Sequence, residues 1–266
     1  MSKFLYIQDF HLKGKNSINR IGNYFEDCLM KFDELISIAK ENKVDAIIDG
    51  GDLFDSPIVS YSVCDAIVDK IEKSGLTYYC LFGNHSERYH SKEHSFDTTL
   101  AHILRRSKSF KYLTHIIGND YIIFGKEYHH DIEEEIKTDG LYCEPEWPSE
   151  DFWKVGIVHA FVCPEPFPYA SHVVCDDIQA SVDLVLVAHY HKVWEKKVGN
   201  TQYLDIGCFG RNSITEANIE PSCVLLDTEK RSYKVIKLKT AKKGKDCFDF
   251  SKIDEQKLKD NNINEF

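Results

Sequence analysis

Short apolar runs alternate with segments of helical periodicity along the first half of this chain. The runs FLYI, VDAIID and TYYCLF have the length and the β-branched or aromatic content of buried strands. Between the first two, in residues 23–43, apolar side chains recur at helical spacing, so that one face of a helix packs on a sheet. These side chains are Phe25, Cys28, Leu29, Phe32, Leu35, Ile36 and Ala39. Residues 60–75 predict the next helix, with Gly75 at its end.

The second half of the chain predicts further strands. A helix over about 96–106 precedes the short strands THIIG and YIIFG, which the pair Gly118-Asn119 joins in a turn. Residues 129–151 are polar and acidic and predict a surface loop, in which His129 and His130 are exposed because no apolar strand holds them. VGIVHAF, VDLVLVA, QYLDIGCF and the hairpin SCVLLDTEKRSYKVIKLK follow as strands. The pattern predicts two packed sheets with helices outside, an α/β fold.

Composition supports one large globular domain. The chain has 266 residues, 42% of them hydrophobic, and a mean hydropathy of -0.37. A chain of this length and apolar content can bury a substantial core. We expect a catalytic domain over residues 1–239 and a charged tail over 240–266, either a docked terminal helix or a disordered partner-binding arm. The amino terminus leads directly into a strand rather than into a cleavable signal, and no apolar run reaches the ~18 residues of a membrane span.

The nine cysteines predict the cellular compartment. Most lie in apolar strands and helices, and no C-x-x-C pair occurs. Buried, reduced thiols in a cytoplasmic protein are the interpretation that fits this pattern.

Acids, amides and imidazoles follow the predicted strands, each just after an apolar run. They are Asp9, His11, Asp52, Asn84, His85, His159, His189 and His191. Oxygen and nitrogen ligands without thiolates suit Mn²⁺, Fe²⁺, Mg²⁺ or Zn²⁺. Since the set is too large for one ion, we expect two ions roughly 3.5–4 Å apart that share a carboxylate, the arrangement used for displacement at phosphorus.

Each of these short motifs is weak when taken alone. A D-x-H, G-N-H or H-x-H sequence arises often by chance, and a single histidine on a strand is more often structural than a ligand. All of them in one order, each at the carboxyl end of a strand where open α/β sheets place their sites, favour a metal centre.

The motifs DFH, GGDLFD, GNH, the strand-borne His159 and AHYH resemble the five signature blocks of the calcineurin-like metallophosphoesterase superfamily. Residues 20–57 resemble the nuclease subunits of double-strand-break repair complexes, the bacterial SbcD-like proteins in particular. GCFGRNS is similar to their P-G-S-x-x-R block, without the Pro and with Arg211 displaced. The resemblance implies a four-layer αββα sandwich of two mixed sheets flanked by helices.

The resemblance also implies roles for the candidate residues. Asp9, His11 and His191 would hold one ion, Asn84, His159 and His189 the other, and Asp52 would bridge them. His85 would donate a proton to the leaving oxygen. Where relatives carry an acid directly after this histidine, the chain has Ser86. Either Glu87 or another acid supports the imidazole, or His85 is less basic here. Mn²⁺ is the metal expected first.

A DNA nuclease acting in repair, recombination or degradation is the function expected first, with an SbcC-like ATPase subunit and a second copy of the chain as further partners. Its DNA-binding rim would include Lys13, Lys15, Arg20 and Arg88. The net charge of -10 opposes this, because backbone binding rests on cations. A phosphodiesterase or phosphatase acting on nucleotides or phosphoproteins, and a non-catalytic module that keeps the fold, remain the alternatives.

Overall fold

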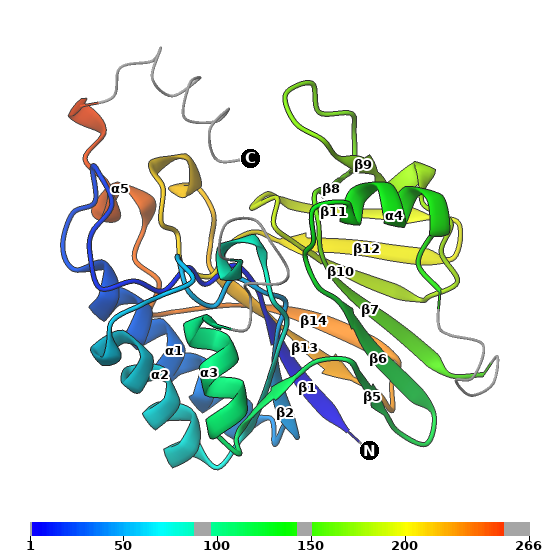
Figure 1. Cartoon of the computed structure of the whole chain (residues 1–266), viewed down its shortest axis with the longest axis horizontal. Coiled ribbons are helices and arrows are strands. Elements are labelled where there is room, and N and C mark those ends of the chain that lie inside the picture. The colour runs from blue at the N-terminus through cyan, green and yellow to red at the C-terminus, as the bar shows by residue number, and fades with distance from the viewer. Residues whose placement is uncertain (1, 88–96, 143–150, 253–266) are drawn as a thin grey trace.

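Two six-stranded sheets pack against each other in the computed structural model, which describes residues 2–87, 97–142 and 151–252 (Figure 1). The first sheet contains β1 (Lys3–Ile7), β2 (Ala46–Asp49), β3 (Thr77–Cys80), β4 (Phe110–Tyr112), β13 (Ser222–Asp227) and β14 (Ser232–Lys237). The second contains β5 (His115–Ile117), β6 (Tyr121–Lys126), β7 (Trp153–His159), β10 (Leu184–Ala188), β11 (Val193–Val198) and β12 (Thr201–Ile206). Their strand orders are β14-β13-β1-β2-β3-β4 and β11-β12-β10-β7-β6-β5.

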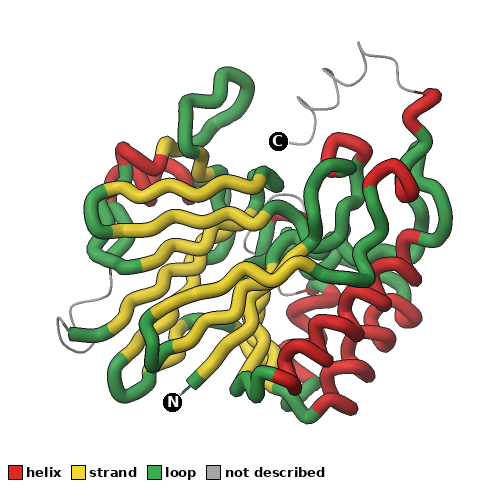
Figure 2. Tube along the Cα trace, turned by 180° about the vertical axis from the view of Figure 1, so that it is seen from behind, coloured by secondary structure: helices red, strands yellow, loops and turns green. Residues whose placement is uncertain are grey.

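Helices cover the outer faces of both sheets. α1 (Tyr24–Glu41), α2 (Tyr61–Ser74) and α3 (Thr99–Arg106) lie together on the first sheet (Figure 2). α4 (Ile132–Asp139) packs on the second sheet, next to the short pair β8 (Val162–Cys163) and β9 (Val173–Val174). Both sheets mix parallel and antiparallel pairs. The predicted four-layer sandwich is therefore confirmed.

Alternation along β1 shows how the layers divide the core. Leu5 and Ile7 pack in the cluster beneath α1 and α2, whereas Phe4 and Tyr6 pack between the two sheets. Successive side chains of a strand point to opposite faces, so a strand covered on both sides is apolar at every position. This explains why FLYI carries no polar alternation.

The predicted helix over residues 23–43 is confirmed as α1. Asn23 caps it, because its side chain accepts a hydrogen bond from the Glu26 amide. The face that includes Cys28, Phe32 and Leu35 is buried on the first sheet. The predicted second helix is α2, and it ends at Gly75 with a left-handed φ of 75°.

The loop predicted over residues 129–151 is partly wrong, because it contains α4. Ile132 and Ile136 lie one turn apart and pack against Phe124 and Val158 of the second sheet. The acidic residues between them concealed this short apolar stripe. His130 is exposed and His129 pairs with Glu135 at 2.9 Å, so neither joins the strand-end residues.

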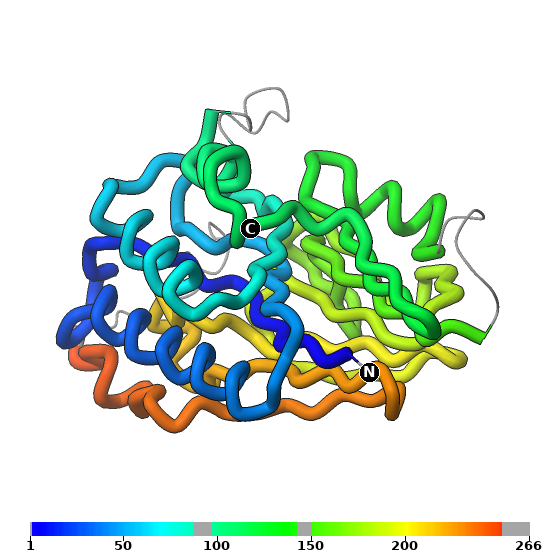
Figure 3. Tube along the Cα trace, turned by 90° about the horizontal axis from the view of Figure 1, so that it is seen from below, coloured from blue at the N-terminus to red at the C-terminus, as the bar shows by residue number. Residues whose placement is uncertain are grey.

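The described part of the tail packs on the domain. α5 (Gly244–Cys247) lies beside the loop before α1, as the red and blue segments of Figure 3 show. The Ile21 amide donates to the Cys247 carbonyl at 2.7 Å, and Phe248 is buried. Residues 253–266 lie outside the described residues. Within the described ranges no helix is long and apolar enough to cross a membrane, and the eight cysteines there are all free thiols.

Candidate metal centre

The parallel strands of both sheets end at a common edge, where the candidate residues lie. In the first sheet β1, β2 and β3 run parallel, and in the second β7 and β10 do. The residues that follow these strands, or end them, are Asp9, His11, Asp52, Asn84, His85, His159, His189 and His191. The two sheets thus bring together all eight side chains that the sequence predicted.

Close backbone approach at this edge requires glycine at two positions. A Cβ on Gly83 would lie 2.1 Å from Oδ1 of Asp52. A Cβ on Gly51 would lie 2.3 Å from Nδ1 of His159, and Gly51 has a φ of 116° that other residues rarely adopt. The glycines of GGD and GNH therefore make room for the neighbouring side chains.

The backbone at the site is strained. Five of the eight predicted residues have a positive φ, namely Asp9, His11, Asp52, His189 and His191. Such conformations are uncommon outside glycine and cost of order 1–3 kcal/mol each unless the side chain compensates locally. Their concentration at one edge is typical of a functional site.

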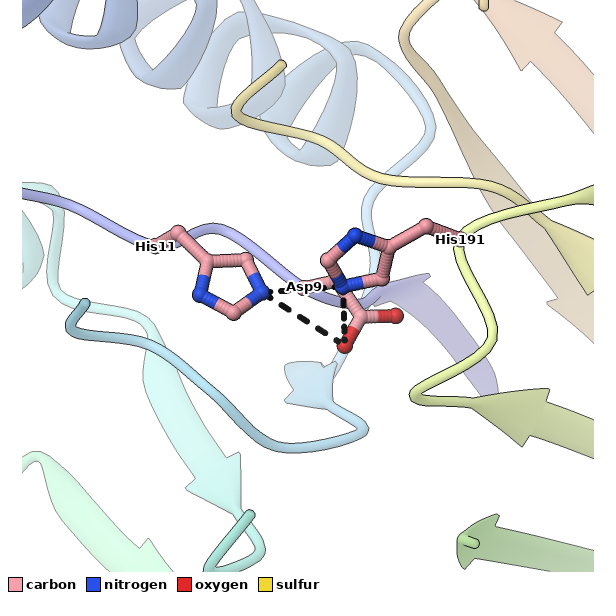
Figure 4. Close-up of side chains that lie close together, drawn as sticks. All are labelled: Asp9, His11 and His191. Atoms are coloured by element: carbon pink, nitrogen blue, oxygen red, sulfur yellow. Dashed lines mark hydrogen bonds and ion pairs between the residues drawn. The ribbon is translucent and has the colours of Figure 1, made fainter. Parts of the chain in front are cut away.

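One cluster of ligand atoms is formed by Asp9, His11 and His191 (Figure 4). The Nε2 atoms of the two histidines lie 3.0 Å apart. Oδ1 of Asp9 lies 3.5 Å from His191 Nε2 and 4.0 Å from His11 Nε2. The three atoms converge from two segments, the loop after β1 and the loop after β10, as ligands of one cation would.

A second cluster surrounds Asn84. Its Oδ1 lies 2.9 Å from Nδ1 of His189 and 3.2 Å from Nε2 of His159. Asp52 completes this group, since its Oδ2 lies 3.3 Å from His159 Nε2.

Asp52 lies between the two clusters. Its Oδ2 is also 3.9 Å from His11 Nε2, while its Oδ1 accepts the His85 amide at 2.9 Å. The side chain is 1% exposed, yet Oδ2 has no hydrogen-bond partner within the described chain. A buried carboxylate is costly unless a cation compensates it. In the metal-free protein the His159 imidazole, 3.3 Å from Oδ2, is that partner, and bound metal ions would take its place. The residues present therefore fit two cations that share Asp52.

Hydrogen bonds orient two of the imidazoles. Nδ1 of His159 lies 2.9 Å from the Gly50 carbonyl, so this nitrogen carries the proton and Nε2 keeps its lone pair. Nδ1 of His191 lies 2.7 Å from Oε1 of Glu216, so Nδ1 donates to this carboxylate and Nε2 faces the cluster. Such partners fix the tautomer that a metal ligand needs.

The ligand side chains differ in charge state in the metal-free site. Burial, with His85 and His191 nearby, lowers the pKa of His11 to about 3, and burial beside His159 lowers that of His189 to about 3. Burial opposes ionisation of Asp9, but His191 outweighs it and lowers the pKa of Asp9 to about 2. Burial opposes protonation of His159 and His191, but Asp52 outweighs it and raises the pKa of His159 to about 9, and Asp9 raises the pKa of His191. Since metals bind neutral imidazoles and ionised carboxylates, metal binding would release protons from these two histidines.

His85 has a partner that the sequence did not reveal. Its Nδ1 lies 2.9 Å from the backbone carbonyl of Asp55. Since a carbonyl only accepts, Nδ1 carries a proton and Nε2 is left for the pocket. The backbone of Asp55 thus supports the imidazole, where the sequence had suggested Glu87 or another acid. Ligand atoms of His85, His11 and Asp52 also form a cluster of their own.

Sequence reasoning missed Glu216 and Cys208, which group with His191. Glu216 is 4% exposed and lies in a short 3₁₀ helix that Ser213 caps. The S-x-x-E spacing of a capping box was its only signal. Burial, with Glu216 nearby, holds the pKa of the Cys208 thiol well above its usual range, so the thiol is protonated in the metal-free protein.

The predicted basic rim is only partly at the surface. Lys15 is exposed, and Lys13 is partly exposed beside Asp55 at 3.0 Å. The Arg20 side chain is 2% exposed, pairs with Asp27 at 2.8 Å and stacks on Tyr24, which argues against a substrate contact. Arg88 lies outside the described residues.

The fold and the paired His/Asp clusters define a dinuclear metallophosphoesterase. They do not identify which metal it binds. The chain belongs to the calcineurin-like phosphoesterase family, whose model matches residues 2–193.

Curated relatives give a more distant comparison. The chain is 23% identical over 240 residues to the DNA double-strand break repair protein Mre11 of Methanosarcina mazei, and 26% identical over 246 residues to that of Methanosarcina acetivorans. Each alignment covers 89% of this chain but only 36% of the relative. A solved structure described as a novel archaeal phosphodiesterase is 16% identical to this chain, with a TM-score of 0.49. The match covers 89% of this chain and 99% of that chain.

Proposed function

We propose that this protein is a Mn²⁺-dependent phosphodiesterase that cleaves DNA in repair, recombination or degradation. The observation that carries the two-metal chemistry is the position of Asp52. Its buried Oδ2 lies between the two groups of ligand atoms, 3.3 Å from His159 Nε2 and 3.9 Å from His11 Nε2, and accepts no hydrogen bond from the described residues.

The ligands divide between the ions as the clusters do. In the proposal Asp9, His11 and His191 hold one ion, while Asn84, His159 and His189 hold the other. Asp52 belongs to both. Each ion then has both oxygen and nitrogen donors, a set that suits Mn²⁺ and does not exclude Fe²⁺, Mg²⁺ or Zn²⁺.

His85 is the proposed proton donor. Two dications, when bound, would lower the pKa of a bound water and polarise the phosphoryl oxygens. His85 lines the same pocket as His11 and Asp52. The Asp55 carbonyl accepts the Nδ1 proton, so the imidazolium form of His85 would deliver its Nε2 proton to the leaving oxygen and remain as the neutral Nδ1–H tautomer.

DNA is the proposed substrate because the curated relatives are named as DNA double-strand break repair proteins and align with 89% of the chain. Lys13 and Lys15 follow the first ligands and supply exposed charge near the pocket. An ATPase subunit resembling SbcC, a second copy of the chain and a cytoplasmic location belong to the same proposal. The free thiols are consistent with that location.

A phosphatase or phosphodiesterase for nucleotides or phosphoproteins is the second candidate. The net charge of -10 favours it, since a long polyanion is repelled more than a small one. The pocket at the site is also small, about 90 Å³.

The deciding experiment is an activity panel with Mn²⁺. Linear duplex DNA, single-stranded DNA, a generic phosphodiester and a generic phosphomonoester are compared at equal enzyme concentration. We expect DNA cleavage and a diester preferred over a monoester. Efficient monoester hydrolysis with intact DNA would favour the second candidate instead.

A paired substitution tests the rim. Lys13→Ala/Lys15→Ala should reduce DNA cleavage far more than cleavage of the small diester, because only DNA spans the rim. Arg20 is left unchanged, since its buried ion pair with Asp27 supports the fold. Lys40→Ala/Lys43→Ala, at exposed positions near the opposite end of the first sheet, removes equal charge as a control. Equal losses on both substrates would contradict a DNA-binding role for the rim.

A further inference from the structure

A second cavity, of about 360 Å³, lies on the other side of the segment that borders the metal centre. Its cationic lining residues are Arg211, Lys237, Lys242 and Lys243, and its one acid is Glu220. On a chain with a net charge of -10, a cavity with four cations and one acid is an exception to the bulk charge.

Existing ion pairs leave part of this positive charge available. Lys237 pairs with Glu220, and Lys242 reaches away to Asp27 at 2.6 Å. Within the described chain, neither Lys243 nor Arg211 forms an ion pair with a carboxylate. The lysines at 237 and 243 are exposed, so an incoming anion can reach them.

Arg211 forms the buried wall of the cavity. It is 4% exposed and has a positive φ of 57°. Its guanidinium donates to the carbonyls of Ile219, at 3.3 Å, and Lys242, and its Nε has no hydrogen-bond partner within the described chain. Carbonyls hold the group without cancelling its charge, so Arg211 keeps the cavity electropositive.

The cavity and the metal centre share a wall. Arg211 lines the cavity, whereas the next residue, Asn212, lines the metal pocket and donates to Asp55 at 2.7 Å. Four residues after Asn212, Glu216 lines the metal pocket, and the next residue, Ala217, lines the cavity. A single segment, residues 211–217, therefore lines both spaces.

We propose that this cavity binds a backbone phosphate of the same DNA strand whose scissile phosphate lies at the metal centre. The inference rests on the proposed function. A DNA strand carries a negative charge about every 3.4 Å along the helix axis, so further phosphates follow within a few nucleotides of the cleaved one. A small diester has no second phosphate and gains nothing from the cavity.

The test compares two double variants on one background. Lys237→Ala/Lys243→Ala removes two exposed cavity cations. Lys234→Ala/Lys245→Ala removes two exposed lysines, one in β14 like Lys237 and one in α5 two residues after Lys243, that do not line the cavity. DNA binding is measured by fluorescence anisotropy as a function of salt, and KM is measured for DNA and for a small diester.

We expect the cavity variant to raise the KM for DNA about threefold to tenfold and to reduce the salt slope by about 0.9 for the lost phosphate contact. The KM for the small diester and the behaviour of the control variant should not change. Equal effects of both double variants would overturn the proposal, as would a response on the small diester alone. A wild type that cleaves the diester but neither binds nor cleaves DNA would refute the proposed function itself, which separates the two failures.

Discussion

Glu216 holds His191 in place: Nδ1 of the imidazole lies 2.7 Å from the carboxylate Oε1. The other carboxylate oxygen accepts the Ser213 amide at 2.8 Å, so the acid is fixed by the 3₁₀ helix that contains it. Burial opposes ionisation of Glu216, but His191 outweighs it and lowers the pKa of Glu216 to about 2. A charged, immobile acceptor therefore keeps His191 Nε2 directed at Asp9.

We predict that Glu216→Gln weakens metal binding about 10–100-fold, the usual cost of losing a partner behind a metal ligand. Titration of the metal-free protein with Mn²⁺ by calorimetry measures this. Glu220→Gln, at an exposed position in the same segment, is the matched control. Unchanged affinity in both variants would mean that Glu216 only caps the 3₁₀ helix.

A second prediction concerns Asp52. Asp52→Ala should lower the metal content, measured by elemental analysis, to one ion or none per chain and abolish activity, because this carboxylate lies between both clusters. Asp69→Ala, at an exposed site of α2, should retain two ions. Two ions and full turnover in the Asp52 variant would remove the residue from the bridging role.

His85 separates proton transfer from metal binding. His85→Gln should keep both metals and the fold but lower kcat by roughly 10²–10⁴-fold, the usual contribution of a general acid. Elemental analysis and turnover on a small diester are measured together, with the exposed His102→Gln as control. Because His85 also clusters with His11 and Asp52, loss of metal in the variant would identify it as a ligand instead.

Asp49 should make the stability of the metal-free protein depend on pH. Burial, despite hydrogen bonds from Tyr78 and the Gly51 amide, raises the pKa of Asp49 to about 7. The folded state then binds its proton more tightly than the unfolded state, in which an Asp titrates near ~3.9. This stabilisation is complete below pH ~3.9 and is lost as pH rises through about 7, with a slope of up to about 1.4 kcal/mol per pH unit.

Asp49→Asn tests this dependence. Urea denaturation of the chelator-treated proteins at about pH 5 and about pH 8 gives their free energies of unfolding. The variant should gain stability relative to the unsubstituted protein as pH rises, because Asn has no proton to lose. A difference that stays constant across this range would show that Asp49 has an ordinary pKa in the folded state.

The sequence alone was sufficient to predict the strand-end residues and the main layers. Each ligand candidate directly follows or ends a buried apolar strand, and parallel strands bring their carboxyl ends to one edge wherever they pair. Helical periodicity was likewise sufficient to predict α1, because the apolar residues of its buried face recur every three or four positions. Both signals are local, so they can be read without knowing which segments meet.

Only the tertiary structure decided which groups support those residues. Glu216 lies 25 positions from His191, the Asp55 carbonyl lies 30 positions from His85, and Arg211 meets Lys242 across 31. Arg20 resembled a surface cation in the sequence, but the packing of Tyr24 and Phe248 around its guanidinium buries it. Contacts between segments far apart in the chain produce no periodic pattern in the sequence. A backbone carbonyl acceptor cannot be recognised from the residue type that carries it. The sequence therefore determined the chemical groups at the strand ends, whereas chain packing determined their orientation, their charge and the basic cavity beside them.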